Sequence, residues 1–432
     1  MTEINPKQYA ASAINQVGRV PGIPPGMKGR EIRKAAVIGA GLMGSGIAVC
    51  LLSAGIPVLL VDQSQDALAK GRKNVAAALA TLAKRGHLFE GLVAGLQVLL
   101  STTQDYADVA DCDLIIEAVF ERIDVKQAVF RELGRVAKPT AVLATNTSGL
   151  DVDQIAAASG RPADVIGLHF FSPAFMMPLL EIVRGSQTSA EVLRTCLFLS
   201  TIIRKTGVVV GNCHGFAANR TLEGFAREAE FMILQGANPE DVDKAFTNYG
   251  FPMGPCAMGD MAGLDVRVHY LDAMQARGLV PQDARYGALT RALVAQGRLG
   301  QKSGAGNYDY GADARTPLPS DTVLALRDCI AGELGVAQRQ FSEQEIVMRC
   351  LLAVINEAAK VLDEGIVHHA SDVDVLWTYG YGFPGAKGGP VYQARLMGQD
   401  AVRAALLAQQ QSDPQLGATY WAPAPALEKL FA

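Results

Sequence analysis

Short apolar runs alternate with longer amphipathic segments along the first half of the chain. The apolar runs at 35–38, 57–61, 114–116, 141–144 and 165–168 predict strands. The segments 42–54, 65–85 and 122–136 have the periodicity of helices and lie between strands. Strands that alternate with helices are typical of parallel βαβ units, so we expect an α/β fold with a doubly wound sheet.

A glycine-rich turn lies between the first predicted strand and the helix that follows it. Gly39, Gly41 and Gly44 fit GxGxxG, a pattern that brings backbone N–H groups at a helix N-terminus to a pyrophosphate. Asp62 ends the second predicted strand, where a carboxylate accepts hydrogen bonds from ribose hydroxyls and repels a 2′-phosphate. Gln63 and not an arginine follows it, so the sequence predicts a Rossmann-type domain that binds NAD. A plain glycine turn beside a surface aspartate is the alternative interpretation.

The second half of the chain is helical and contains an internal repeat. Arg220 and Glu228 are eight residues apart, and Arg349 and Glu357 repeat this spacing. In each copy a glycine, an Asp-Val-Asp triplet, a Phe-Pro pair and a Gly-Pro pair follow in the same order. Such registered similarity indicates two related helical units.

These patterns predict a division of the chain into parts. Residues 31–213 are expected to form the NAD-binding Rossmann domain, 214–310 a first helical domain and 340–432 a second, duplicated all-α domain. Residues 1–30 are rich in proline and glycine, so we expect an N-terminal arm or linker on the surface. We further expect a monomer in which 340–432 packs on 214–310.

Composition and charge exclude several classes of protein. The chain has 432 residues, of which 49% are hydrophobic and 19% charged, so it can form cores and is not a disordered chain. Its 39 basic and 43 acidic residues give a net charge of −4, so no nucleic-acid partner is expected. The apolar stretches are too short to span a bilayer, so no membrane partner is expected.

Cysteine usage points to a reducing compartment. The seven cysteines are widely spaced and form no CxxC motif, so we expect neither a disulfide framework nor a metal site. The first residues lack the apolar segment of a signal peptide, and the C-terminal Lys-Leu-Phe-Ala matches no peroxisomal signal. The expected location is therefore the cytoplasm.

Two polar residues in apolar runs form the candidate catalytic pair. His169 ends a predicted strand, at the edge of the sheet where ligands bind, and Glu181 lies in an apolar run twelve residues later. A carboxylate in an apolar run needs a partner, and a carboxylate beside an imidazole holds its tautomer and makes it a better proton acceptor. From spacing alone, a structural core histidine remains an open alternative. Ser148, in the polar stretch 145–148 after another strand, is expected at the same edge, although this stretch also suits a helix cap.

Taken together, these segments resemble the L-3-hydroxyacyl-CoA dehydrogenase family. The resemblance covers nearly the whole chain from about Lys34. The duplicated helical domain and the proline-bearing arm resemble the dehydrogenase half of the bifunctional enoyl-CoA hydratase/3-hydroxyacyl-CoA dehydrogenases, whose hydratase half is absent here. The matching segments are 39–48, 116–119 with Lys126, 145–148, 167–173, 178–183, 215–220, 254–255, 263–265 and 300–304.

The resemblance implies an enzyme of β-oxidation that uses NAD to oxidise (S)-3-hydroxyacyl-CoA to 3-oxoacyl-CoA. His169 is implied as the general base with Glu181 paired to it, and Ser148 and Asn219 as contacts to the substrate's oxygen atoms in a cleft between domains. Arg85 is implied as a contact to the phosphates of the acyl-CoA substrate. The implied NAD site comprises Gly39, Gly41, Leu42, Met43, Gly44, Asp62, Gln63, Glu121, Lys126, Ser172 and Lys302.

Two positions depart from the family's pattern. Ala78 occupies a second CoA-contacting position and has no side-chain donor, and Asn307 replaces an aromatic residue. Two other functions stay open: a dehydrogenase of a small free β-hydroxy acid, and an inactive scaffold subunit. A hydratase or a thiolase is the candidate partner protein.

Overall fold

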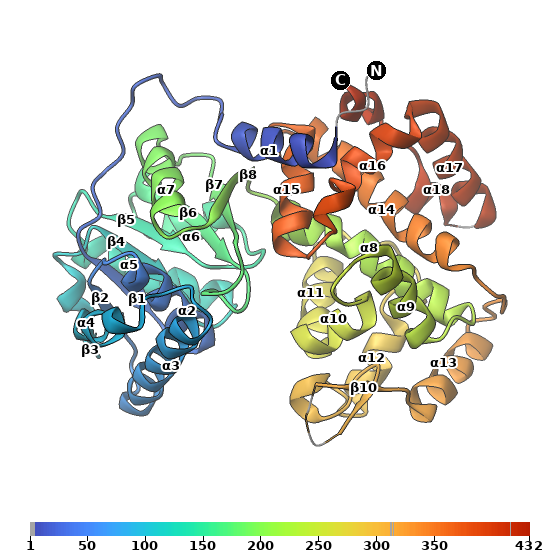
Figure 1. Ribbon diagram of the computed structural model, residues 1–432, viewed down its shortest axis with the longest axis horizontal. Helices are drawn as coiled ribbons and strands as arrows, with labels where there is room; N and C mark the ends of the chain where they lie inside the picture. The colour runs from blue at the N-terminus through green and yellow to red at the C-terminus, as the bar shows by residue number, and fades with distance from the viewer. Residues whose placement is uncertain (1–4, 312, 314, 415) are drawn as a thin grey trace. The chain divides into compact units, whose positions relative to one another are not determined.

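The computed structural model describes residues 5–311, 313, 315–414 and 416–432 (Figure 1). Contacts divide the chain into two compact units. The first, here the sheet unit, runs to Asn219 and includes Glu364–Tyr381. The second, here the helical unit, comprises Arg220–Asp363 and Gly382–Ala432. The segment 340–432, expected as one helical domain, therefore contributes Glu364–Tyr381 to the sheet unit.

The sheet unit is built on an eight-stranded sheet with the order β3-β2-β1-β4-β5-β6-β7-β8. Strands β1 to β6 are parallel, and this doubly wound arrangement confirms the predicted fold class. Strand β7 runs antiparallel to β6, and β8 is parallel to β7. The strands are β1 (Ala35–Ile38), β2 (Val58–Val61), β3 (Leu100–Thr103), β4 (Leu114–Glu117), β5 (Val142–Thr145), β6 (Val165–Phe170), β7 (Leu179–Arg184) and β8 (Thr206–Gly211).

Helices cover both faces of this sheet, because each apolar strand must be buried on both sides. They are α2 (Leu42–Ser53), α3 (Gln65–Lys84), α4 (Val93–Val98), α5 (Ile123–Val136), α6 (Val152–Ala158) and α7 (Ala190–Ile202). Short 3₁₀ turns lie at 90–92, 106–109 and 162–164.

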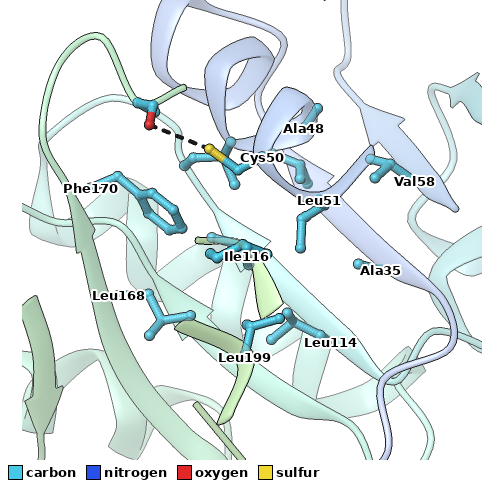
Figure 2. Packing of buried hydrophobic residues seen from close by; sticks show 14 of the residues in the cluster. Ala35, Ala48, Cys50, Leu51, Val58, Leu114, Ile116, Leu168, Phe170 and Leu199 are labelled. Atoms are coloured by element: carbon cyan, nitrogen blue, oxygen red, sulfur yellow. Dashed lines mark hydrogen bonds between the residues drawn. The ribbon is translucent and has the colours of Figure 1, made fainter. Parts of the chain in front are cut away.

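Helix α2 is apolar on all sides and packs into the main core of the sheet unit. Figure 2 shows its Cys50 and Leu51 among side chains of the sheet, with Ile116 and Phe170 close by. The Cys50 thiol donates a hydrogen bond to the carbonyl oxygen of Ala174 at 3.3 Å. This burial holds the N-terminus of α2, and with it the glycine turn, at the end of β1.

The N-terminal arm, expected as a surface linker, contains helix α1 (Pro6–Val17). Asn5 caps this helix by accepting a hydrogen bond from the Lys7 backbone N–H at 2.9 Å, and Pro6 occupies its first position. Tyr9, Ala13 and Val17 recur every four residues and are buried. In the sheet unit, α1 packs on α15 (Ala370–Gly380) and β8 (Figure 1).

The remaining helices repeat in the order that the sequence predicts. Helices α8 (Phe216–Leu234), α9 (Pro239–Tyr249), α10 (Pro255–Ala262) and α11 (Leu264–Ala276) have 19, 11, 8 and 13 residues. Helices α14 (Glu343–Asp363), α15, α16 (Pro390–Met397) and α17 (Gln399–Ser412) have 21, 11, 8 and 14. The other elements are α12 (Ala288–Ala295), β9 (Asp309–Tyr310), β10 (Pro317–Leu318), α13 (Asp321–Glu333), α18 (Gly417–Trp421) and 3₁₀ turns at 301–303, 385–387 and 427–431.

Within the helical unit, the two copies of the repeat exchange ion pairs. Arg220 Nε lies 2.7 Å from Glu357 Oε1, and Arg349 Nε lies 2.7 Å from Glu228 Oε2. Each arginine of the repeated pattern therefore meets the glutamate of the other copy. Helix α14 also packs on α9, so part of the second copy lies on the first, as predicted. None of the described helices is both long and apolar enough to cross a membrane.

Candidate active site

The three glycines of the turn after β1 have distinct local environments. Gly39 has a φ of 103°, which an L side chain rarely adopts. A Cβ atom on Gly44 would lie 1.8 Å from the carbonyl oxygen of Gly39, so only glycine lets α2 approach the strand this closely. Apart from its two chain neighbours, no described residue has an atom within 4 Å of a Cβ placed on Gly41, so the space above the second glycine is open. In the described part of the chain no side chain caps the N-terminus of α2, so its N–H groups suit a pyrophosphate, and the turn fits NAD.

Asp62 stands at the end of β2 beside this turn. Its Oδ2 accepts a hydrogen bond from the Ala40 backbone N–H at 2.9 Å, and its Oδ1 accepts one from the Ser64 backbone N–H at 3.0 Å. The carboxylate is therefore held next to the glycines, as its predicted role toward the ribose requires. Gln63 accepts at its carbonyl oxygen from Gln104 Nε2 at 2.7 Å.

The hydrophobic residues of the turn differ in exposure. Leu42 is 70% exposed at the start of α2, whereas Met43 is partly buried against the core. Both positions follow the second glycine, and their contact with NAD stays a prediction.

His169 and Glu181 form a buried pair. The register between β6 and β7 places the two residues directly opposite each other, and His169 Nδ1 lies 2.8 Å from Glu181 Oε2. The other carboxylate oxygen, Oε1, accepts a hydrogen bond from the Ala218 backbone N–H at 2.9 Å, near the N-terminus of α8. Both carboxylate oxygens are thus satisfied, and Nδ1 is committed to Glu181. The other ring nitrogen, Nε2, is the one left for a substrate.

Aromatic rings fix the plane of the imidazole. The centroid of the Phe171 ring lies 4.5 Å from that of His169, and the Phe216 centroid lies 5.9 Å from it. Phe216 has a φ of 50°, which a residue with a side chain rarely adopts, so the chain enters α8 through strained backbone. That entry directs the Ala218 N–H at Glu181, which explains why a strained turn stands beside the pair.

Ser148 is held by Glu121. One oxygen of the Glu121 carboxylate accepts from Ser148 Oγ at 2.9 Å, from the Ser148 backbone N–H at 2.7 Å and from Thr147 Oγ1 at 2.7 Å. Lys126 Nζ lies 3.3 Å from the other oxygen. Burial pushes the pKa of Glu121 upward, but the charge of Lys126 and the donated hydrogen bonds outweigh it and leave the pKa below its usual value.

Lys126 is buried beneath this loop and does not lie on an open surface. Its Nζ lies 2.7 Å from Glu117 Oε1, and Thr145 Oγ1 donates to Glu117 Oε2 at 2.7 Å. Lys126 and Glu117 are fully buried. Sequence reasoning missed Glu117, although it is a carboxylate inside the apolar run 114–119, and a carboxylate inside an apolar run is the signal that pointed to Glu181.

Asn219 is brought to Ser148 from the first turn of α8. Its Nδ2 donates to the Ser148 carbonyl oxygen at 3.0 Å, and its Oδ1 accepts from the Tyr381 hydroxyl at 2.8 Å. Tyr381 follows α15 and was not predicted as a site residue. No local motif marks it, because its only signal is a contact between segments 162 residues apart.

Other predicted site residues are not joined to this cluster by a hydrogen bond or an ion pair between described residues. Ser172 is exposed in the turn after β6, and Arg85 is exposed at the end of α3, where its guanidinium approaches the Met176 sulfur at 4.0 Å. Lys302 belongs to the helical unit and pairs with Asp265 at 2.5 Å. The roles of these three residues toward NAD and CoA stay predictions.

The two departures from the family's pattern have packing roles. Ala78 is buried in the main core of the sheet unit, among apolar side chains. Asn307 donates from Nδ2 to Asp260 Oδ1 at 3.0 Å, so it satisfies a buried carboxylate. Among the residues that the structure describes, no group of three or more His, Cys, Asp or Glu side chains is arranged to hold a metal ion.

Comparison with known proteins assigns both halves of the chain. Residues 34–213 match the model for the NAD-binding domain of 3-hydroxyacyl-CoA dehydrogenase, and residues 215–310 and 346–432 match the model for its C-terminal domain. The peroxisomal bifunctional enzyme of Danio rerio is 40% identical over 94% of this chain and 57% of its own length. The chain thus spans about half the length of the curated relatives it matches.

Two solved structures resemble the fold. The 3-hydroxybutyryl-CoA dehydrogenase of Escherichia coli K12 is 27% identical, with a TM-score of 0.80 over 93% of this chain and 98% of its own. The (S)-3-hydroxybutyryl-CoA dehydrogenase of Ralstonia eutropha is 33% identical, with a TM-score of 0.61 over 65% of this chain and 100% of its own.

Proposed function

We propose that this chain is an NAD-dependent dehydrogenase that oxidises 3-hydroxyacyl-CoA to 3-oxoacyl-CoA with His169 as the base. The chain belongs to the 3-hydroxyacyl-CoA dehydrogenase family. The observation that carries this role is the buried pair of His169 Nδ1 and Glu181 Oε2 at 2.8 Å. It leaves one ring nitrogen for the substrate and sets the tautomer in which that nitrogen can accept a proton.

Oxidation of the 3-hydroxyl removes a proton from oxygen and a hydride from carbon. His169 Nε2 takes the proton, and Glu181 stabilises the imidazolium that results, since its carboxylate lies against Nδ1. Held by the glycine turn and Asp62, NAD would supply the acceptor for the hydride. In the reverse direction His169 returns the proton to the oxygen of the 3-oxo group.

Donors around Ser148 orient the substrate's oxygen. The Asn219 amide nitrogen lies 3.0 Å from the Ser148 carbonyl oxygen, so the amide and the serine present polar groups together. A donor at this oxygen stabilises the negative charge that develops as the proton leaves. We therefore assign Asn219 to the substrate as this donor and Ser148 to the substrate as the neighbouring polar contact, with Glu121 and Lys126 supporting Ser148.

The proposal also covers the class of substrate and the partner enzymes of this chain. Relatives named peroxisomal bifunctional enzyme and peroxisomal fatty acid beta-oxidation multifunctional protein are considerably longer than this chain, which supports a place in β-oxidation beside a hydratase or a thiolase. Arg85, exposed at the end of α3, suits a phosphate of CoA. A free β-hydroxy acid would not need this arginine, which separates the second candidate substrate from the first.

We also propose that the chain works as a monomer in a reducing compartment, the cytoplasm. No disulfide joins the seven cysteines in the described part of the chain, and five of them are buried, which supports the reducing compartment. Several relatives are named peroxisomal, so microscopy of the tagged chain in its own cells is the test. Sedimentation at micromolar concentration tests the monomer, and a tight dimer would contradict it.

The activity test uses the purified chain, NAD and (S)-3-hydroxybutyryl-CoA. We expect NADH to form with this substrate and not with free 3-hydroxybutyrate, and to form about 10²–10⁴ times more slowly in His169→Ala. The variant should keep its affinity for NAD, because the glycine turn is untouched. Full turnover in His169→Ala would remove this residue from the mechanism, and absence of NADH with the wild-type chain would refute the function.

A further inference from the structure

A tyrosine from the second copy of the repeat contacts the predicted substrate-binding asparagine. Tyr381 directly follows α15, and its hydroxyl donates to Asn219 Oδ1 at 2.8 Å. The same asparagine donates from Nδ2 to the Ser148 carbonyl oxygen at 3.0 Å. The three residues all belong to the sheet unit, so they form one connected group.

These two hydrogen bonds determine which way the amide of Asn219 points. The carbonyl oxygen of Ser148 can only accept, so the amide nitrogen must face it. The amide oxygen then faces Tyr381, whose hydroxyl has a proton to give. An amide nitrogen carries two hydrogens, and Ser148 takes one of them, so the second is left to donate to a ligand.

Ser148 itself is poorly placed to donate its hydroxyl proton. Ser148 Oγ lies 2.9 Å from Glu121 Oε1, and a carboxylate accepts without donating. The hydroxyl proton is therefore directed at Glu121, and the serine oxygen can only accept from other groups. Among Ser148 and Asn219, the amide N–H is the donor that remains for the oxygen of the substrate.

Close packing holds Tyr381 in place. A Cβ atom on Gly380 would lie 2.7 Å from Leu179 Cδ2, so this glycine lets the end of α15 approach β7. The Tyr381 ring packs edge-on against Phe171 at 5.8 Å and against Trp377 at 5.3 Å. Phe171 also contacts His169, so one set of rings fixes both the tyrosine and the imidazole.

We propose that Tyr381 is a positioning residue of the dehydrogenase reaction, which orients the Asn219 carboxamide so that its free N–H meets the 3-oxygen of the substrate. The inference rests on the proposed function and goes beyond it, since it gives the second repeat a role in catalysis. The 3-oxygen becomes more negative as its proton moves to His169, so the hydrogen bond that the Asn219 N–H donates to it is stronger in the transition state than in the ground state.

The test compares two tyrosines of the same segment. In Tyr381→Phe we expect kcat for 3-hydroxybutyryl-CoA to fall about three- to tenfold, with the KM for NAD unchanged, because one hydrogen bond is lost and the ring stays. Tyr379→Phe is the matched control: Tyr379 lies two residues earlier, is half-buried, and its hydroxyl bonds to no residue that the structure describes. This control should keep the wild-type kcat.

A double-mutant cycle with Asn219→Ala separates positioning from a general structural role. If Tyr381 acts through Asn219, Tyr381→Phe has no further effect on kcat in the Asn219→Ala background. Independent, multiplying losses would overturn the proposal, and so would a wild-type kcat in Tyr381→Phe. Neither result touches the proposed function, which fails only if the wild-type chain forms no NADH.

Discussion

Replacing Glu181 with glutamine keeps the shape of the side chain but changes what it offers to His169. In the native site, Oε1 accepts from the Ala218 N–H at 2.9 Å and Oε2 lies 2.8 Å from His169 Nδ1. In Glu181→Gln the amide oxygen must stay toward the Ala218 N–H, since an amide NH₂ there would meet another donor. The NH₂ group then faces Nδ1 and donates to it. The imidazole proton moves to Nε2, and this tautomer cannot accept the proton of the substrate.

The expected loss equals the contribution of a general base. We expect turnover of 3-hydroxybutyryl-CoA to fall about 10²–10⁴-fold. Stability should change by only about 1 kcal/mol, since Glu181→Gln replaces a buried charge with a neutral group that keeps both hydrogen bonds. Affinity for NAD should not change, because Glu181 lies on β7 and the glycine turn follows β1.

The assay measures NADH formation at saturating substrate, together with NAD affinity by fluorescence titration and the thermal unfolding midpoint. Glu191→Gln is the matched control, because Glu191 is an exposed carboxylate that pairs with Arg30 at 3.0 Å on another part of the unit. A Glu181→Gln enzyme with the turnover of the control would refute the reasoning. A fall in both turnover and unfolding midpoint would assign the carboxylate to folding.

Three further predictions test the cofactor site and the core. Gly41→Ala should weaken NAD binding about tenfold at an unchanged melting temperature, since its Cβ meets no atom of the described residues within 4 Å beyond its chain neighbours. Gly44→Ala should weaken NAD binding and also destabilise the fold by about 1–3 kcal/mol, because its Cβ would collide with the Gly39 carbonyl oxygen. Titration and scanning calorimetry measure NAD affinity and melting temperature, and equal changes in the melting temperature of the two variants would contradict the assigned roles. Asp62→Asn should reduce the preference for NAD over NADP about tenfold, measured as the ratio of kcat/KM values, since an amide does not repel a 2′-phosphate. Burial raises the pKa of Cys50 to about 11, so an alkylating reagent at about pH 8 should label the exposed Cys329 well before Cys50. Labelling of Cys50 should rise at higher pH, because the thiolate forms there. Labelling is followed by mass spectrometry, and a result in which Cys50 is labelled first would refute this prediction.

Sequence patterns predicted the parts of the site that are local in the chain. The glycine turn, Asp62 and the pair of His169 and Glu181 each follow or interrupt an apolar run, and such a run predicts both the strand and the sheet edge at which it ends. Residues 171–178 connect β6 to the antiparallel β7, and the register of the two strands sets His169 opposite Glu181, a contact that the spacing of twelve residues alone left open.

Features that depend on contacts between distant segments were not predictable from the sequence. Helix α1 was expected as a linker because prolines and glycines dominate the stretch that follows it. The hydroxyl of the buried Tyr9 donates to the Asp374 carboxylate at 2.6 Å. Tyr9 indicates a packed helix only when Asp374 is known to lie beside it. Tyr381 was missed for the same reason, since its partner Asn219 is far away in sequence.

The repeat is an exception, since there the sequence did carry a long-range contact. A reciprocal contact between two copies places residue i of one copy on residue j of the other, and j on i. An arginine and a glutamate eight residues apart in each copy therefore form two ion pairs, Arg220 with Glu357 and Arg349 with Glu228. The spacing of eight residues between arginine and glutamate, found in each copy of the repeat, is the spacing that the two reciprocal ion pairs require.

The two pairs differ in burial, and this difference predicts unequal stabilities. Side-chain exposures are 9% and 0% in the Arg349–Glu228 pair but 21% and 20% in the Arg220–Glu357 pair. Arg349→Met leaves a buried carboxylate, which Arg227 still contacts at 2.8 Å, so we expect a loss at the lower end of about 3–5 kcal/mol. Arg220→Met should cost about 1 kcal/mol or less, because water reaches its partner. Denaturant unfolding followed by circular dichroism measures both losses, and equal losses would show that burial does not set the strength of these pairs.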